Sequence, residues 1–211
     1  MPDGHAVPVE VIPAGPERLD ALAPVFGRAF VDDPMMGWTM GDLPRSPDRY
    51  TPCFSAFLQQ VLPYGVVWEA GAVPEAGAEV GRALGAAVWM PPGQFEEWAV
   101  HPWNQPRILE RTDDGGRRYE AFWQWVDEHG PAEPAWLLDS IAVDPVVQGR
   151  GYGSALIADG LERARSEGLG AHLSTGTERN VAVYSRLGFR VAEALDAPDH
   201  GPHIWFMCWD P

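Results

Sequence analysis

The chain of 211 residues is 45% hydrophobic and 21% charged, which is the balance of a single soluble globular domain. Thirty acidic residues outnumber fifteen basic ones, and the net charge of −15 disfavours nucleic acid and favours attraction of protonated amines. An acidic surface that only maintains solubility is the alternative explanation. All fifteen basic residues are arginine, so there is no lysine for Schiff-base catalysis or for a P-loop.

Metal sites, disulfides and membrane segments are not expected. The two cysteines have no CxxC spacing, and the six histidines form no HExxH motif. No apolar run approaches the roughly 18 residues that span a bilayer. The N-terminal residues lack the basic and apolar regions of a secretion signal. We therefore expect a cytoplasmic protein, a monomer or a homodimer, that binds neither membrane nor nucleic acid.

The spacing of apolar residues predicts a mixed α/β order. The first half predicts a strand at 7–12, a helix at 17–30, a loop at 31–47, a helix at 52–62 and strands at 64–69 and 82–90. The polar, tryptophan-rich segment 94–130 predicts two helices around a turn at 112–116. The last part predicts a strand at 136–143, a helix at 151–167, a strand at 171–175, a helix at 180–187 and strands at 189–193 and 204–209.

A glycine-rich turn at residues 148–153 opens the helix at 151–167. Such a turn directs several backbone N–H groups and the positive end of the helix dipole at one point, where an anion can bind. Glycine lets a phosphate approach the backbone closely, and Arg150 adds a cation. Ser154 stands where a dinucleotide-binding GxGxxG turn needs its last glycine, and a plain helix cap remains the alternative.

Two motifs resemble those of the GCN5-related N-acetyltransferase (GNAT) superfamily. The sequence QxxGxG, after a strand that ends in a Val-Asp-Pro turn, resembles motif A. Residues 172–193 resemble motif B, where Asn180 precedes a helix that carries Tyr184 just before Leu-Gly-Phe. The resemblance implies the GNAT fold, of the α/β (α+β) class. This fold is a central, mixed, mostly antiparallel sheet of six to seven strands, flanked by helices and splayed between strands 4 and 5.

The resemblance also implies one GNAT domain over residues 1–211. It would consist of an N-terminal part at 7–90, a variable tryptophan-rich helical insertion at 91–132, motifs A and B at 133–193 and a C-terminal strand at 194–211. Residues 133–209 look similar to the branch of puromycin N-acetyltransferase and its drug-modifying or self-resistance relatives.

An enzyme that transfers the acetyl group of acetyl-CoA directly to a small-molecule amine is what this resemblance implies, in antibiotic resistance or natural-product tailoring. A protein or peptide N-acetyltransferase is one alternative. A non-catalytic acyl-CoA-binding sensor is the other, and the retained Asn180 and Tyr184 argue against it.

The resemblance further assigns the coenzyme contacts. A bulge in the strand at 136–143 would free backbone N–H groups for the pantetheine arm and the carbonyl oxygen. Asn180 would hydrogen-bond that arm, unless it is a helix N-cap. Tyr184 would be the general acid for the departing thiolate, because a phenol holds its proton at neutral pH. The expected acetyl-CoA contacts are Ile141, Ala142, Val143, Gln148, Gly149, Arg150, Gly151, Tyr152, Gly153, Ser154, Asn180 and Tyr184.

The general base is predicted at Asp139. The puromycin branch has a glutamate in an FLET sequence where this chain has His-Leu-Ser-Thr, and Ser174 is too weak a base to replace it. Asp139 interrupts an apolar strand on the face shared with Ile141, where burial would raise its pKa towards neutrality. A water-positioning or a structural carboxylate is the alternative. His172 is expected at the surface.

The acceptor amine is expected to contact Asp32, Asp33, Trp89 and Trp123. The two aspartates would pair with an ammonium group or would instead cap the turn at Pro34. Trp98, Trp103, Trp123 and Trp125 all lie in the insertion. Trp123 and Trp125 cannot share a helix face, so one of them is expected to line a cleft or a subunit contact. An aromatic pocket with carboxylates suits a bulky cationic or aromatic amine.

Overall fold

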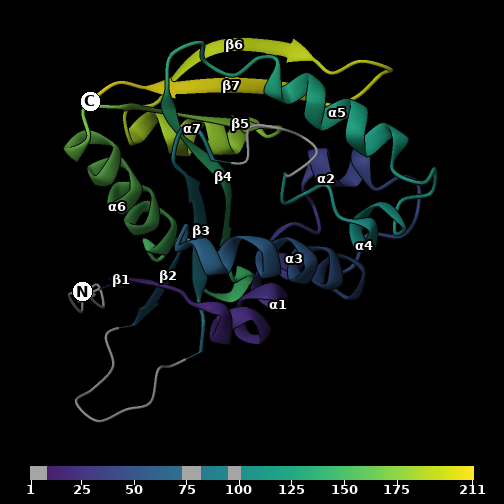
Figure 1. Ribbon diagram of the computed structural model, residues 1–211, viewed down its shortest axis with the longest axis horizontal. Helices are drawn as coiled ribbons and strands as arrows, with labels where there is room; N and C mark the ends of the chain where they lie inside the picture. The colour runs from purple at the N-terminus through teal and green to yellow at the C-terminus, as the bar shows by residue number, and fades with distance from the viewer. Residues whose placement is uncertain (1–8, 73–81, 95–100) are drawn as a thin grey trace, which may run out of the picture.

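The computed structural model describes residues 9–72, 82–94 and 101–211. The beginning of the strand predicted at 7–12, most of the connection between the predicted strand pair, and Trp98 lie outside the described residues. Within these ranges the mixed α/β order predicted from the sequence is confirmed (Figure 1).

A seven-stranded sheet in the order β1-β2-β3-β4-β5-β7-β6 forms the centre of the structure. The pair β4–β5 is parallel, and every other neighbouring pair is antiparallel. This confirms the mixed, mostly antiparallel sheet of the prediction. The strands are β1 (Val9–Pro13), β2 (Val67–Ala72), β3 (Gly85–Met90), β4 (Ala135–Val143), β5 (Gly170–Thr175), β6 (Arg190–Asp196) and β7 (His203–Trp209).

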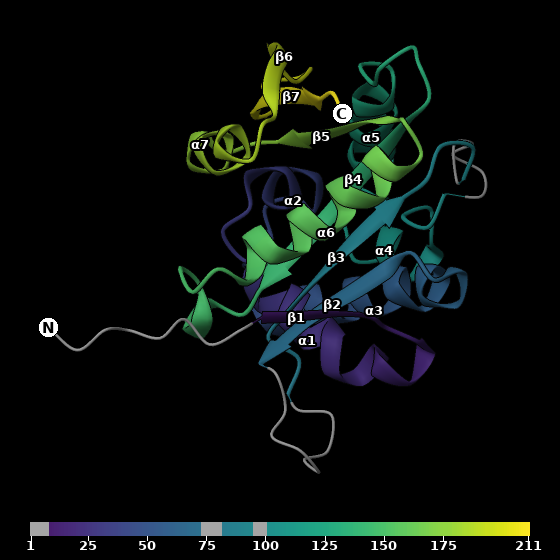
Figure 2. The same cartoon turned by 90° about the vertical axis from the view of Figure 1, so that its left-hand side faces the viewer.

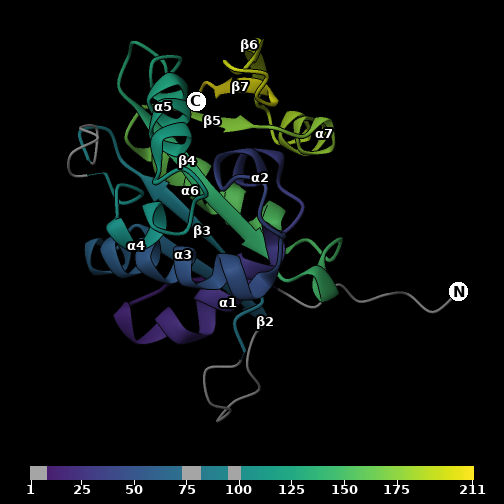
Figure 3. The same ribbon diagram turned by 90° about the vertical axis from the view of Figure 1, so that its right-hand side faces the viewer.

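Helices cover both faces of the sheet. Helix α6 crosses one face of the strands β1 to β4 (Figure 2), whereas α1 and α3 lie on the opposite face (Figure 3). The helices are α1 (Leu19–Ala29), α2 (Pro34–Thr39), α3 (Pro47–Val61), α4 (Pro106–Leu109), α5 (Arg117–Asp127), α6 (Tyr152–Ser166) and α7 (Glu178–Arg186). Short 3-10 turns occur at Pro16–Arg18, Leu62–Tyr64 and Pro145–Val147.

Helix α2 occupies part of the segment predicted as a loop at 31–47, so that prediction is wrong there. The carboxylate of Asp33 accepts a hydrogen bond from the Met36 N–H at 2.8 Å, and Pro34 stands at the first helical position. A side-chain cap followed by proline is a favourable helix start. Helix α3 likewise begins before the predicted residue 52, because Ser46 caps it by accepting from the Arg49 N–H at 3.3 Å.

Trp89 fixes the packing of β3 against α6. It is fully buried, and its indole N–H donates to the Leu156 carbonyl at 3.4 Å. A Cβ added at Gly160 of α6 would lie 2.1 Å from the Trp89 ring, so only glycine leaves room for it. Trp89 is therefore a core residue on the α6 side of the sheet, and its predicted contact with the acceptor is wrong.

Strands β4 and β5 separate soon after they meet. They pair only through residues 135–137 of β4 and 170–172 of β5, although β4 continues to residue 143 and β5 to residue 175. The predicted splay between strands 4 and 5 is therefore confirmed. Beyond residue 137, the edge of β4 that faces β5 has no strand partner among the described residues.

Candidate active site

The glycine-rich turn lies at the end of β4 that is open towards β5, and it leads into α6. Gly149 and Gly151 have φ angles of 79° and 91°, a left-handed conformation that other residues rarely adopt. A Cβ added at either glycine would meet no atom within 4 Å, so the space above the turn is open. The Ala155 N–H donates to the Gly151 carbonyl at 3.0 Å, which leaves the earlier N–H groups of the first turn facing the open space. This geometry fits a bound diphosphate.

Other residues of the turn have distinct roles. The side chain of Tyr152 is buried in the core, so only its backbone N–H is available at the turn, while Arg150 and Ser154 are exposed. The Gln148 amide donates to the Val143 carbonyl at 3.2 Å, which closes the turn back onto the end of β4.

Asp144 anchors the turn to the rest of the fold. Its carboxylate accepts hydrogen bonds from Arg28 and Arg82, each at 2.7 Å, and from the Val146 N–H at 3.2 Å. Burial alone would raise the pKa of Asp144, but these donors hold it below its ordinary value. The fully buried carboxylate is thus kept ionised and fixes the start of the turn.

Asp139 is the bulged residue of β4. Leu138 pairs with Trp89 and Ser140 pairs with Val88, so Asp139 is the extra residue opposite two consecutive positions of β3. The bulge was expected near residues 141–143, but these residues pair regularly with β3. Their free side is instead the edge towards β5, which the splay leaves without a strand partner among the described residues.

The indole of Trp103 holds the Asp139 side chain. Its Nε1–H lies 3.2 and 3.3 Å from the two carboxylate oxygens. Burial, with a smaller contribution from the negative charge of Asp127, raises the pKa of Asp139 to about 7. Asp127 ends α5, and burial raises its pKa to about 6. No sequence pattern predicts the Trp103 contact, because this residue is 36 positions away in the chain.

Trp103 is itself held by an aromatic cluster. Its ring stacks on Phe57 at 3.9 Å and on Trp123 at 6.2 Å between centroids. Trp123 therefore supports the Trp103 ring from α5, whereas Trp125 packs against Phe206 of β7 at 5.6 Å. Both tryptophans are half-buried and both also contact Phe122, so the expectation that one of them lines a cleft or a subunit contact stays a prediction.

Tyr184 lies in α7 with only 8% of its surface exposed. Burial, and then the nearby charge of Asp33, raise the pKa of its phenol above the ordinary value. The phenol therefore keeps its proton throughout the neutral pH range. Asn180, one turn earlier, donates to Thr175 Oγ1 at 3.3 Å, and the N-cap position belongs to Thr177. The alternative that Asn180 caps the helix is therefore wrong.

The two acceptor aspartates differ in their surroundings. Asp32 is exposed, whereas Asp33 caps α2, which is one of the two roles considered for it. Burial raises the pKa of Asp33 to about 6, against the hydrogen bonds of the helix start. His172, expected at the surface, is half-buried in β5, and burial lowers its pKa to about 4. It is therefore neutral at pH 7.

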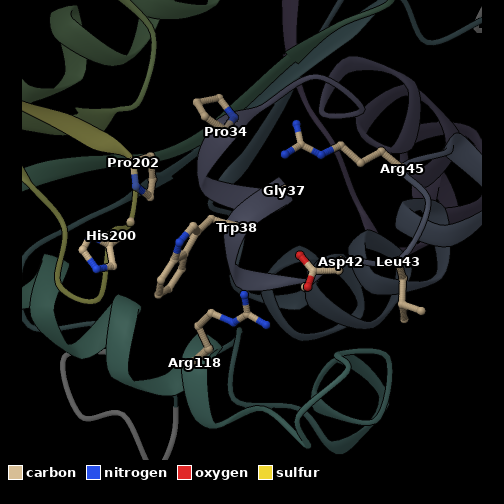
Figure 4. A pocket seen from close by; sticks show the side chains of 11 residues that line it. Pro34, Gly37, Trp38, Asp42, Leu43, Arg45, Arg118, His200 and Pro202 are labelled. Carbon is tan, nitrogen blue, oxygen red and sulfur yellow. The ribbon is translucent and has the colours of Figure 1, made fainter.

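A surface pocket of about 470 Å³ lies next to α2 and has Pro34, the neighbour of Asp33, in its lining (Figure 4). Helix α2, the start of α5 and the turn between β6 and β7 form its walls. Figure 4 shows Trp38 between His200 and Arg118, with Arg45 alongside Gly37 of α2. Its charged lining residues are Arg45, Arg118 and Asp42, whereas the pocket expected from the sequence carries carboxylates.

Neither a metal site nor a membrane-spanning helix is present in the part of the chain that the structure describes. There, histidine, cysteine and acidic side chains form no group of three or more that could ligate a metal ion. In the same ranges, no helix has the length and apolar character needed to cross a bilayer.

Comparison with known proteins agrees with the fold and the turn. Residues 95–189 match the model of the acetyltransferase (GNAT) family. A solved structure from Corynebacterium glutamicum, described as histone acetyltransferase HPA2 and related acetyltransferase, has 23% identity and a TM-score of 0.68 over 96% of both chains. A Drosophila melanogaster polyamine N-acetyltransferase has 16% identity and a TM-score of 0.66 over 97% of this chain and 100% of its own. The family model thus matches part of the chain, and the two solved structures share its fold.

The predicted puromycin-like branch is not confirmed. A mycothiol acetyltransferase from Rhodococcus erythropolis is 31% identical over 61% of this chain and 48% of its own length. The chain thus spans about half the length of this curated relative. The family model and this relative are both acetyltransferases, and acetyl-CoA is the donor that GNAT acetyltransferases use.

Proposed function

We propose that this protein transfers the acetyl group of acetyl-CoA to the amine of a small molecule. The observation that carries the proposal is the separation of β4 from β5 next to the open glycine turn. In the proposal, the backbone edge of β4 and the first turn of α6 would bind a long coenzyme with a diphosphate and an extended arm, and Tyr184 of α7 would reach its sulfur end.

Different residues of the chain would bind the donor, supply a proton to its sulfur and take a proton from the acceptor. Bound acetyl-CoA would supply the acetyl group as a thioester. The turn from Gln148 to Ser154 would bind the diphosphate through backbone N–H groups, and the free edge of residues 141–143 would bind the arm. The Tyr184 phenol would hold a proton at its hydroxyl oxygen for the departing sulfur. Asp139 would accept a proton from the ammonium group of the acceptor, since its pKa of about 7 suits a base at neutral pH.

A role in antibiotic resistance or natural-product tailoring remains the predicted setting, as do the cytoplasmic location and the monomeric or homodimeric state. The names of the relatives, mycothiol acetyltransferase and polyamine N-acetyltransferase, also support a small-molecule acceptor. A protein or peptide acceptor would need an extended groove, whereas the pocket beside α2 has the size of a small molecule at about 470 Å³.

The Tyr184→Phe variant tests the proposal. We expect turnover to fall by roughly 100-fold or more, because general acid catalysis contributes on that order, while the affinity for acetyl-CoA is unchanged. Release of free thiol from acetyl-CoA with a panel of amines measures turnover, and calorimetry measures affinity.

Tyr64→Phe is the matched control, because Tyr64 is 59% exposed and lies outside the site. Full turnover in Tyr184→Phe would contradict the acid assignment. A wild-type protein that binds acetyl-CoA but acetylates no amine or peptide would indicate the sensor instead.

A further inference from the structure

The pocket beside α2 carries more positive than negative groups, although the chain as a whole has a net charge of −15. Arg45 and Arg118 line it with a single carboxylate, Asp42, and the ring of His200 is part of the same lining. Asp42 forms no ion pair with either arginine among the described residues. The chain has twice as many acidic as basic residues, so two arginines on one small pocket are a local departure from the overall charge.

Arg45 is one of the two arginines of the pocket, and its charge interacts with the nearby carboxylate of Asp33, which caps α2. Its guanidinium lies on α2 against Gly37, where an added Cβ would be 2.2 Å from Arg45 Cζ. Because Gly37 has no side chain, the guanidinium can pack directly against α2 at the wall of the pocket. Within the described ranges, no carboxylate lies within ion-pair distance of Arg45. Its planar donors are thus available to a carboxylate or a phosphate from outside the chain.

Arg118 supplies a second, fixed cation across the pocket. It donates to Asp113 at 2.9 Å and lies above the Trp38 ring, with its Cζ 5.2 Å from the ring centroid. Asp114 Oδ2 lies a further 4.0 Å from Arg118 Nε, and together these contacts orient the side chain and balance its charge. Arg45 and Arg118 therefore act unequally, and Arg45 is the one whose loss should matter more.

The pocket and the reaction site share α2. Pro34 lines the pocket, and the adjacent Asp33 lies close enough to Tyr184 to raise the pKa of the phenol. Pro34 also packs on the turn between β5 and α7, since a Cβ added at Gly176 would lie 2.7 Å from its ring. Asp33 and Pro34 thus connect a wall of the pocket with the turn after β5 and with Tyr184.

We infer that the acceptor amine carries an anionic group, a carboxylate or a phosphate, which Arg45 and Arg118 bind in this pocket. The inference rests on the proposed function, and it names the acceptor class. It replaces the cationic acceptor expected from the overall charge, because the local side chains rather than the net charge contact the ligand.

Matched pairs of amines test the inference. Phenylalanine against phenethylamine and arginine against agmatine isolate a carboxylate, and glucosamine 6-phosphate against glucosamine isolates a phosphate. We expect kcat/KM to favour the anionic member of at least one pair. Arg45→Glu should reduce that preference by about 10- to 100-fold, the size of a lost charge-assisted contact, and Arg45→Lys should restore part of it.

Arg107→Glu is the control of equal charge change, because Arg107 is exposed on α4 and does not line the pocket. The inference is overturned if the uncharged or cationic member of every pair reacts as well, or if Arg45→Glu keeps the preference of the wild type. Both of those results leave the proposed acetyl transfer standing. Failure of every acceptor overturns the proposed function and this inference together.

Discussion

Asp139 combines three features that a base needs. The bulge in β4 places it opposite two residues of β3, one indole N–H from Trp103 holds it, and burial raises its pKa to about 7. At neutral pH the Asp139 carboxyl is therefore ionised in about half of the molecules. An ammonium group must lose a proton to such a base before it can attack. The second carboxylate at Asp127 adjusts this balance through its negative charge.

The Asp139→Asn variant should remove the rise of kcat/KM with pH that centres near 7. Asparagine keeps an oxygen that accepts from Trp103 but cannot take up a proton. A profile of kcat/KM from pH 5 to 9 measures this change. Asp127→Asn is the comparison, and it should move the rise to lower pH, because removal of the neighbouring negative charge lowers the pKa of Asp139.

Stability provides a second readout for the same residue. The pKa of Asp139 is raised on folding, so its contribution to the free energy of unfolding is present below the unfolded value of 3.8 and is lost as the pH rises through about 7. As the pH rises from 4 to 8, the free energy of unfolding should fall less for Asp139→Asn than for the wild type. If the free energy of unfolding changed equally with pH in the variant and the wild type, the raised pKa of the Asp139 carboxyl would be contradicted.

Residue-scale prediction succeeded where the chemistry is local in the chain. Gly149 and Gly151 follow one another around a helix start, so their left-handed turn was readable from spacing alone. Trp89 and Arg45 could not be placed in this way. Trp89 packs against Gly160 of α6, and Arg45 packs against Gly37 of the neighbouring α2. Such contacts form only when the chain folds.

Helix α6 and strand β3 form an interlocked pair through Trp89 and Gly160. Most elements were predictable because their apolar spacing repeats over several turns or strand residues. Helix α2 was missed because it has six residues and its stability depends on the Asp33 cap and on tertiary packing. Short elements of this kind leave too few periods to detect in a sequence.

The Gly160→Ala variant should lower the free energy of unfolding by about 1–3 kcal/mol, the usual cost of overpacking a core. Alanine favours a helix interior over glycine by about 1 kcal/mol, so a loss would show that the contact with Trp89 outweighs propensity. Urea unfolding measures the difference. Gly71→Ala in β2 is the control, because an added Cβ there meets no atom within 4 Å. Equal stability of the two variants would contradict the interlock.

The whole molecule divides along the line between β4 and β5. On one side β1 to β4 pack with α1, α3 and α6, and on the other β5 to β7 pack with α7 (Figures 1 and 2). Three residue pairs join the two parts of the sheet directly. A molecule bound between them adds contacts to both parts, so it should stabilise the fold strongly.

Coenzyme A at 100 times its dissociation constant should stabilise the protein by about 2.7 kcal/mol and raise the melting temperature by roughly 5–10 °C. Hydrogen exchange should slow at residues 141–143 of β4 and at the first turn of α6. Gly151→Asp is the control, because a carboxylate at the open turn repels the diphosphate and should abolish both effects. A shift of equal size in this variant would place the coenzyme elsewhere.

At this scale the sequence predicted the sheet and its splay through the two motifs that flank them. The acceptor side was less predictable, since its pocket joins residues near position 40, residue 118 and the turn at residue 200. No pattern in a single sequence links segments so far apart. The net charge was a poor guide there, because it averages over a surface whose charges are unevenly distributed.

Helix α2 contributes both to the pocket and to the surroundings of Tyr184. The same six residues present Trp38 to the pocket and begin at the carboxylate beside Tyr184. Any redesign that reshapes this helix to admit a new acceptor will also disturb the acidity of the phenol. Selectivity and pH optimum should consequently drift together among natural or engineered variants of this segment, so that a change in one trait forecasts a change in the other.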